Sequence, residues 1–164
     1  MTRVLLAAVI FGFCIPTGAE EPPHLSRAQI DYLERCGGCH GIEGVSAQEL
    51  VPTLRHRAGY FLCTRLAREY LVRLPSVATS PLSDEAVANL MNFVVFDIGD
   101  APNLAPNAQT FSAAEVHLLR RNPLNEVALS AYRSGVIEDL IRRCGAPPAL
   151  RDYRPSAAPA TGAR

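Results

Sequence analysis

The sequence predicts an all-α protein, because capped segments with a helical spacing of apolar residues recur along the chain. Three such segments begin at Ser26, Ser83 and Ser112, and serine is a residue type that caps helix N-termini well. After each cap, apolar residues recur three or four positions apart, which places them on one face of a helix. No stretch alternates apolar and polar residues as a half-buried strand does, and the sequence has no internal repeat.

The first expected helix begins at Ser26, which forms a capping box with Gln29, and it stops at Gly37-Gly38. Residues 41–52 contain two glycines and have no helical periodicity, which predicts a loop. The second expected helix covers Tyr60–Val72, where apolar residues recur at helical spacing with arginines between them.

The second half of the chain is expected to hold further helices. Residues 75–81 predict a loop, and a helix follows over 83–98 with two acidic residues in its first turn, where the helix dipole favours them. A second capping box opens a helix over 112–121, which Asn122-Pro123 ends. The last expected helix covers about 124–143.

The first 19 residues are typical of a secretory signal peptide. Arg3 supplies one positive charge, an apolar run from Val4 to Ile15 follows, and Thr17-Gly18-Ala19 offers small residues for cleavage. The run is shorter than the roughly 20 residues of a membrane-spanning helix, although an uncleaved anchor is the alternative. We therefore expect cleavage near Ala19, a periplasmic location and no stable membrane anchor.

The charge and the cysteine content limit the range of functions that we expect for the chain. Sixteen basic residues balance 16 acidic ones, so nucleic-acid binding has no electrostatic basis. Five cysteines are present: Cys14 leaves with the signal peptide, and two others lie in the motif described next. The remaining pair, Cys63 and Cys144, is expected to form a disulfide in an oxidising compartment.

The strongest chemical motif is Cys36-Gly37-Gly38-Cys39-His40, a C-x-x-C-H sequence that is typical of c-type haem attachment. Two thiols at this spacing each form a thioether with one vinyl group of the porphyrin, and the adjacent imidazole reaches the iron. A thioredoxin-like site lacks the β-α-β setting that it needs. A zinc site would need two more ligands, and Cys63 and His56 each stand alone.

Over roughly residues 25–98 the chain resembles the monohaem class I cytochromes c. The likeness rests on the motif with Gly41, on Val51-Pro52-Thr53-Leu54, on Gly59-Tyr60-Phe61-Leu62 and on the segment 82–90. It implies a cytochrome c-like helical domain over 20–100, wrapped round one covalent haem c. Residues 101–145 are then an added helical extension, and residues 146–164, rich in Pro and Ala, predict a disordered tail.

The resemblance also implies roles for single residues. The carbonyl of Pro52 would accept a hydrogen bond from Nδ1 of His40, and Leu54 would pack on the haem face. The helix from Ser83 would cross the helix that ends at Cys36.

The sequence departs from the family where a methionine usually provides the sixth iron ligand. Residues 73–81 contain neither Met nor His, and Leu74 occupies the best-matching position. Met91 is the candidate sixth ligand, although a core role is the alternative for it. The other options are His24, His56, His117, water, a backbone group and a ligand from another protein.

We therefore expect a non-enzymatic electron carrier that exchanges one electron with a dehydrogenase, a reductase or another cytochrome. The alternatives are a haem-based module that binds or senses small ligands through an open sixth position, and a haem subunit of a larger oxidoreductase. An arginine-rich stretch within 51–75 would either steer an acidic redox partner or form a solvated helix face. Its members are Arg55, Arg57, Arg65, Arg68 and Arg73.

Overall fold

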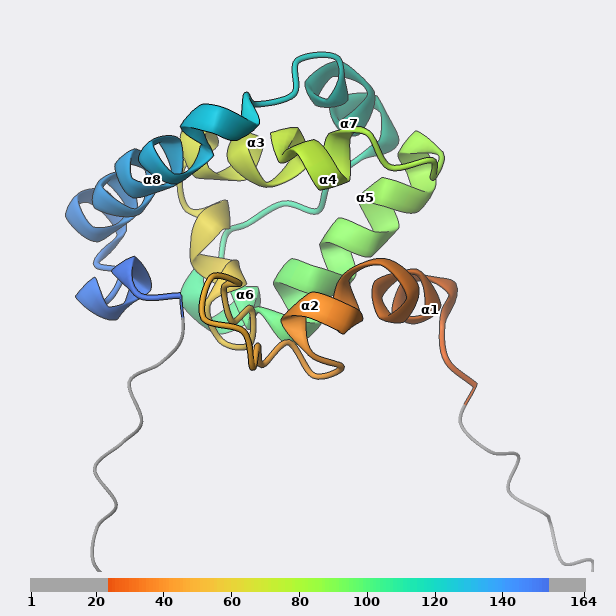
Figure 1. Ribbon diagram of the computed structural model, residues 1–164, viewed down its shortest axis with the longest axis horizontal. Helices are drawn as coiled ribbons and strands as arrows, with labels where there is room; N and C mark the ends of the chain where they lie inside the picture. The colour runs from red at the N-terminus through yellow and green to blue at the C-terminus, as the bar shows by residue number, and fades with distance from the viewer. Residues whose placement is uncertain (1–23, 154–164) are drawn as a thin grey trace, which may run out of the picture.

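The computed structural model describes residues 24–153, and within this range the chain forms helices and loops with no β-strand (Figure 1). The predicted all-α class is confirmed. The α-helices are α1 Arg27–Tyr32, α2 Gly38–His40, α3 Arg65–Arg73, α4 Pro75–Ala78, α5 Asp84–Asn92, α6 Ala101–Leu104, α7 Ala113–Arg120 and α8 Leu129–Cys144. The π-helical turns are η1 Leu33–Gly37 and η3 Phe93–Ile98, and the 3-10 turns are η2 Ala58–Leu62, η4 Glu126–Ala128 and η5 Pro148–Arg151.

The first helix is longer than its glycines predicted. Helix α1, turn η1 and helix α2 follow one another without a break, so the expected stop at Gly37-Gly38 is wrong. Both glycines adopt right-handed helical backbone angles. A glycine lowers the stability of a helix, but its backbone can still take the helical conformation. The helix ends after His40 at Gly41, whose φ of 80° is the conformation that breaks it.

Two other expected boundaries also differ. The helix expected over 60–72 is divided into η2 and α3, because Thr64 starts a new helix by accepting a hydrogen bond from the Ala67 amide. The loop expected over 75–81 contains the short helix α4, whose first residue is Pro75. Proline fits that position since its fixed φ suits the first helical turn.

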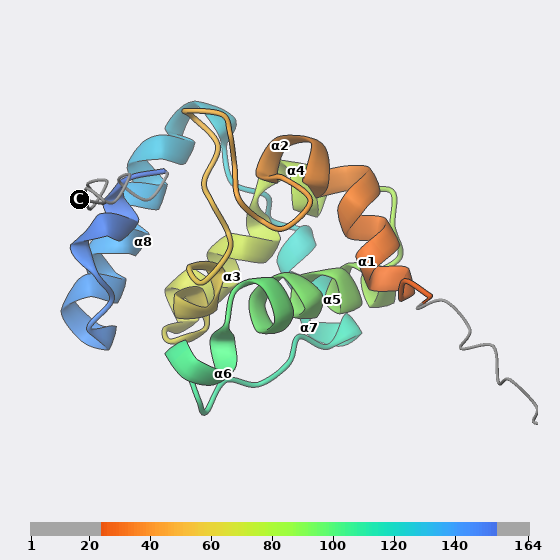
Figure 2. The ribbon, with the colours of Figure 1, turned by 90° about the horizontal axis from the view of Figure 1, so that it is seen from below.

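Helix α5 crosses α1, as the resemblance implies (Figure 2). The ring of Tyr32 meets that of Phe93 edge-on at a centroid distance of 5.7 Å. Tyr32 is 1% exposed, and its hydroxyl donates a hydrogen bond of 2.7 Å to the Gly41 carbonyl. Burial raises the pKa of Tyr32 to about 12, so the hydroxyl stays protonated and ties Tyr32 to the end of the first helix at Gly41.

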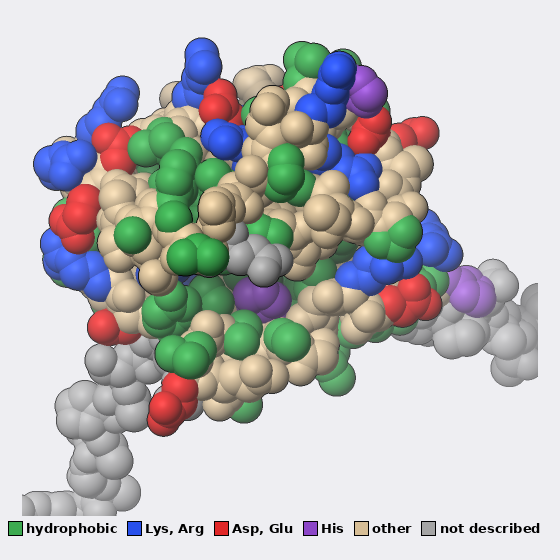
Figure 3. Space-filling model, turned by 45° about the horizontal axis from the view of Figure 1, so that its top comes forward, with side chains coloured by type: hydrophobic (Ala, Val, Ile, Leu, Met, Phe, Trp, Pro, Cys, Tyr) green, Lys and Arg blue, Asp and Glu red, His purple; other side chains and the backbone are tan. Residues whose placement is uncertain are grey.

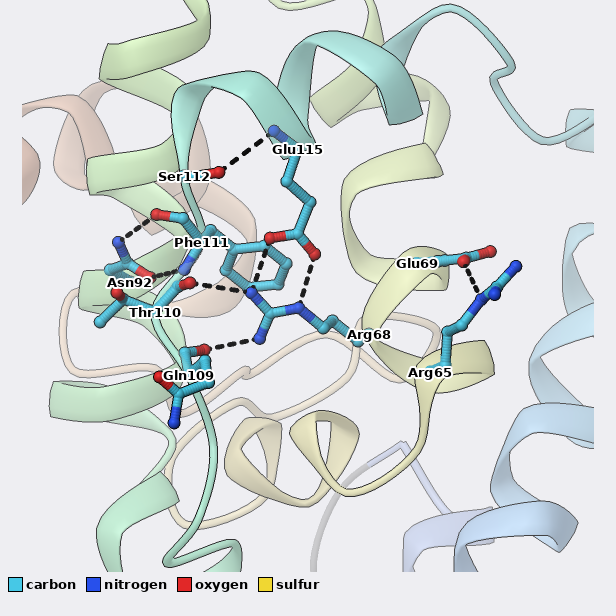
Figure 4. Close-up of polar contacts among 9 residues, drawn as sticks. All are labelled: Arg65, Arg68, Glu69, Asn92, Gln109, Thr110, Phe111, Ser112 and Glu115. Carbon is cyan, nitrogen blue, oxygen red and sulfur yellow. Dashed lines mark hydrogen bonds and ion pairs between the residues drawn. The ribbon is translucent and has the colours of Figure 1, made fainter.

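The helical extension packs on the rest of the protein through α7 and α8, which contact α5 and α3. Arg68 of α3 forms an ion pair with Glu115 of α7 and lies 3.9 Å above the ring centre of Phe111 (Figure 4). The same guanidinium donates to the carbonyls of Gln109 and Thr110. Arg68 therefore joins α3 to the start of the extension rather than facing solvent.

The predicted disulfide between Cys63 and Cys144 is confirmed, with the two Cα atoms 6.3 Å apart. It joins the residue after η2 to the last residue of α8. The chain then turns back at Gly145 and forms η5, where Leu150 is 2% exposed. A disordered tail beginning at residue 146 is therefore wrong for residues 146–153, because this segment is packed against the protein.

Some predictions fall on parts of the chain outside residues 24–153. The signal peptide over 1–19 and the last part of the predicted tail, 154–164, are among them. Within 24–153 no helix combines the length and apolarity needed to cross a membrane.

Candidate functional site

An apolar pocket lies where the first helix, the loop before η2, helices α3 to α5 and the C-terminal segment meet. The C-terminal segment is residues 145–153, which follow α8 and include η5. Its empty volume, including the open mouth, is about 720 Å³. Figure 3 shows one face of the molecule on which hydrophobic side chains gather around a hollow with a histidine side chain visible inside it. Two residues of the C-x-x-C-H motif, Cys36 and His40, line the pocket.

The imidazole of His40 is held in one tautomer. Nδ1 lies 2.8 Å from the carbonyl oxygen of Pro52, the contact that the resemblance implies. Because a carbonyl only accepts, Nδ1 carries the proton and Nε2 keeps its lone pair. Burial lowers the pKa of His40 below its usual value, and the Pro52 contact opposes this only in part. The ring is therefore neutral and able to bind a metal through Nε2.

The two motif thiols are free and differ in their surroundings. Cys36 is half-buried in the pocket wall, and burial raises the pKa of its thiol. Cys39 is exposed and does not line the pocket. The two cysteines lie three positions apart in a continuous helix, a spacing that brings their side chains to neighbouring places on one face.

The turn after the motif requires glycine at position 41. A Cβ atom at Gly41 would lie 2.2 Å from the carbonyl oxygen of Val45, and its φ of 80° disfavours other residues. Ser46 is buried in this turn, and its hydroxyl donates to the Cys39 carbonyl. The loop thereby returns the chain towards Pro52, which reaches His40.

Of the side chains proposed as a sixth iron ligand, Met91 is the one in the pocket wall. Met91 is 4% exposed on α5. His24, His56 and His117 are exposed and do not line the pocket. His56 instead contacts Asp100 at 3.3 Å, and His117 contacts Asp84 at 2.9 Å. Leu54 and Leu74 both line the pocket.

The structure adds pocket residues that the sequence patterns did not indicate. They are Arg57, Tyr70, Arg133 and Leu150, among others. Arg57 had been placed in a surface cluster, and the other three are distant from the motif in sequence. No spacing rule links them to Cys36, since only tertiary packing brings them together.

The arginine-rich stretch does not form one solvated face. Arg55 pairs with Glu43, and Arg65 pairs with Glu69. Arg68, with its side chain 15% exposed, pairs with Glu115 of the extension, and Arg73 donates to the Asn122 carbonyl. Arg68 and Arg73 therefore join α3 to the extension, whereas Arg65, whose side chain is 89% exposed, pairs within its own helix.

Comparisons with known proteins assign no family. No protein-family model matches the chain, and no curated protein matches it. Within residues 24–153, no three His, Cys, Asp or Glu side chains lie close enough together to hold a metal ion. The fold and the site define a helical protein with an apolar pocket whose wall carries part of a C-x-x-C-H motif.

Proposed function

We propose that the chain is a c-type cytochrome that carries one electron between redox proteins. Cys36 and Cys39 would hold the haem by thioethers, and Nε2 of His40 would bind its iron. The observation that carries the proposal is the contact of 2.8 Å between His40 Nδ1 and the Pro52 carbonyl, next to two free motif thiols. This contact leaves the nitrogen that faces away from Pro52 ready to bind iron.

The pocket residues fit the cofactor. The walls are mostly apolar, and side chains such as Leu54, Leu74 and Val94 suit a porphyrin face. Haem, when bound, supplies reversible one-electron chemistry. The protein orients the axial imidazole, raises its donor strength through the Pro52 carbonyl and limits the access of water.

In this proposal the protein acts as a carrier and not as an enzyme. Its location would be the periplasm, after removal of the signal peptide. Its partners would be a dehydrogenase, a reductase or another cytochrome. No membrane anchor and no nucleic acid would be involved.

A second function is favoured by Leu74, which lines the pocket where the resembled family has a ligand methionine. With a leucine there, the sixth position would be open to small molecules unless Met91 reaches it. Carbon monoxide added to the reduced protein distinguishes these cases: prompt binding supports the open position. If carbon monoxide does not bind, Met91→Leu should make the iron accessible to it, because leucine cannot be a ligand.

The proposal is tested by expressing the full chain together with a haem-attachment system. The purified protein should carry the mass of one haem through denaturation and give oxidised and reduced cytochrome spectra. His40→Ala should keep the thioethers but lose the low-spin spectrum, and His117→Ala, on the exposed face of α7, is the matched control. A colourless protein without the added mass would refute the proposal.

A further inference from the structure

Two arginine side chains line the pocket without a carboxylate partner. Arg133 of α8 is 8% exposed, and Arg57, which precedes η2, is half-buried. Among the described residues neither one forms an ion pair. Their hydrogen bonds to the described residues go to backbone carbonyls of the C-terminal segment: Arg57 donates to Ala149, Asp152 and Tyr153, and Arg133 donates to Leu150 and Arg151.

Two cations in an apolar pocket are costly. Carbonyl dipoles satisfy hydrogen bonds, but they leave the net charge uncompensated. The pKa of Arg57 is lowered, first by burial and then by the nearby Arg133 cation, and the Asp152 carboxylate opposes this only in part. The positive charge of this end of the pocket is therefore matched by no acid within it, which favours an anionic ligand.

Tyr70 of α3 adds a neutral donor to the same pocket. It is 5% exposed and lies between the rings of Phe61 and Tyr132. Burial raises its pKa to about 12, so the hydroxyl remains protonated. No hydrogen bond joins this hydroxyl to another described residue, and it is not one of the fully buried polar atoms that lack a partner, so it keeps some exposed surface in the pocket. A ligand in the pocket would provide a partner.

We propose that Arg57, Arg133 and Tyr70 bind the two propionate carboxylates of the haem. This inference rests on the proposed function. The propionates of haem lie at the edge opposite the vinyl groups that react with the motif cysteines. Correspondingly, Cys36 belongs to the first helix and Arg133 to α8, and these elements lie on opposite flanks of the molecule in two perpendicular views (Figures 1 and 2).

The assignment gives the helical extension a binding role. Arg133 belongs to residues 101–145, outside the part of the chain that resembles the cytochromes. The ring of Tyr153 lies 4.4 Å from the Arg133 guanidinium carbon and helps to orient it. The alternative is that the two arginines only tether the C-terminal segment, and the experiment must separate this tether from carboxylate binding.

The experiment compares holoproteins by reduction potential and by the propionate bands of the resonance Raman spectrum. Arg57→Gln and Arg133→Gln should lower the midpoint potential, because a cation near the haem disfavours the oxidised iron. Tyr70→Phe should shift a propionate band while its ring stacking is kept. The matched control is Arg142→Gln on the same helix, whose side chain is 66% exposed and outside the pocket. Potentials and bands equal to those of the control would overturn the inference.

Failure of the proposed function is recognised separately, since the wild-type protein would then carry no covalent haem. If the glutamine variants do not fold, the inference is tested on the wild-type holoprotein alone, through the pH dependence of its propionate bands. Its propionate bands should stay those of ionised carboxylates well below the ordinary carboxyl pKa of about 4.3, because two cations stabilise the ionised form. Bands that titrate as an exposed carboxyl does would overturn the inference.

Discussion

Removing the disulfide between Cys63 and Cys144 should lower the stability of the protein without opening the pocket. The change is the double substitution Cys63→Ser with Cys144→Ser, which leaves no unpaired thiol to react with the motif cysteines. The C-terminal segment has other attachments: the Thr53 amide donates to the Tyr153 carbonyl at 2.7 Å, and Arg57 donates to three carbonyls. The folded state should therefore keep its shape, and the effect should arise in the unfolded chain.

The size of the effect follows from the length of the closed loop. The two cysteines are 81 positions apart in the sequence. In the chain-entropy description, a crosslink over a loop of that length stabilises the folded state by about 4.5 kcal/mol at 25 °C. For a chain of this size, 1 kcal/mol corresponds to roughly 3–4 °C in Tm. The double variant should therefore melt roughly 15 °C below the wild type.

The assay is thermal unfolding of the variant and of the wild type with its disulfide oxidised, followed by far-ultraviolet circular dichroism. At low temperature the circular dichroism spectra of variant and wild type should agree. Treating the wild type with a thiol reductant should lower its Tm to that of the variant, and the variant should not respond. Equal melting temperatures would refute the reasoning, because the crosslink would then constrain nothing in the unfolded chain.

Three further changes have expected results. Cys36→Ala or Cys39→Ala should leave a single thioether and less haem retained on a denaturing gel, and retention at the wild-type level would contradict the attachment. Gly59→Ala should cost about 1–3 kcal/mol by denaturant titration, since its Cβ would lie 2.5 Å from the Gly99 carbonyl oxygen, whereas Gly135→Ala in the open middle of α8 should cost nothing. Ser83→Ala should cost about 1 kcal/mol through loss of the α5 cap.

Elements with a cap could be predicted from the sequence, whereas their ends could not. Ser26, Ser83 and Ser112 each cap the helix expected of them, because a cap is a local hydrogen bond. The helix end predicted at Gly37-Gly38 was wrong, because a helix end at glycine is not fixed by a local hydrogen bond. Whether a glycine ends a helix depends on its φ, which tertiary packing sets at Gly41 and not at Gly37.

The motif half of the pocket was also predictable. Cys36 and His40 lie close in sequence, and the Pro52 contact follows from the family resemblance. The other half was not predictable, because Arg57, Tyr70 and Arg133 come from three elements separated by many residues. Nothing in their local sequence distinguishes them from the other arginines and tyrosines.

The helical extension belongs to the pocket, and three independent contacts support this conclusion. The disulfide fixes the end of α8 next to η2, Leu150 lies buried in the pocket wall, and Arg57 binds the carbonyls that follow Leu150. Any one of these contacts alone would be consistent with a separate unit resting on the surface. Together they place the C-terminal segment across one wall of the pocket, so residues 129–153 are needed to complete it.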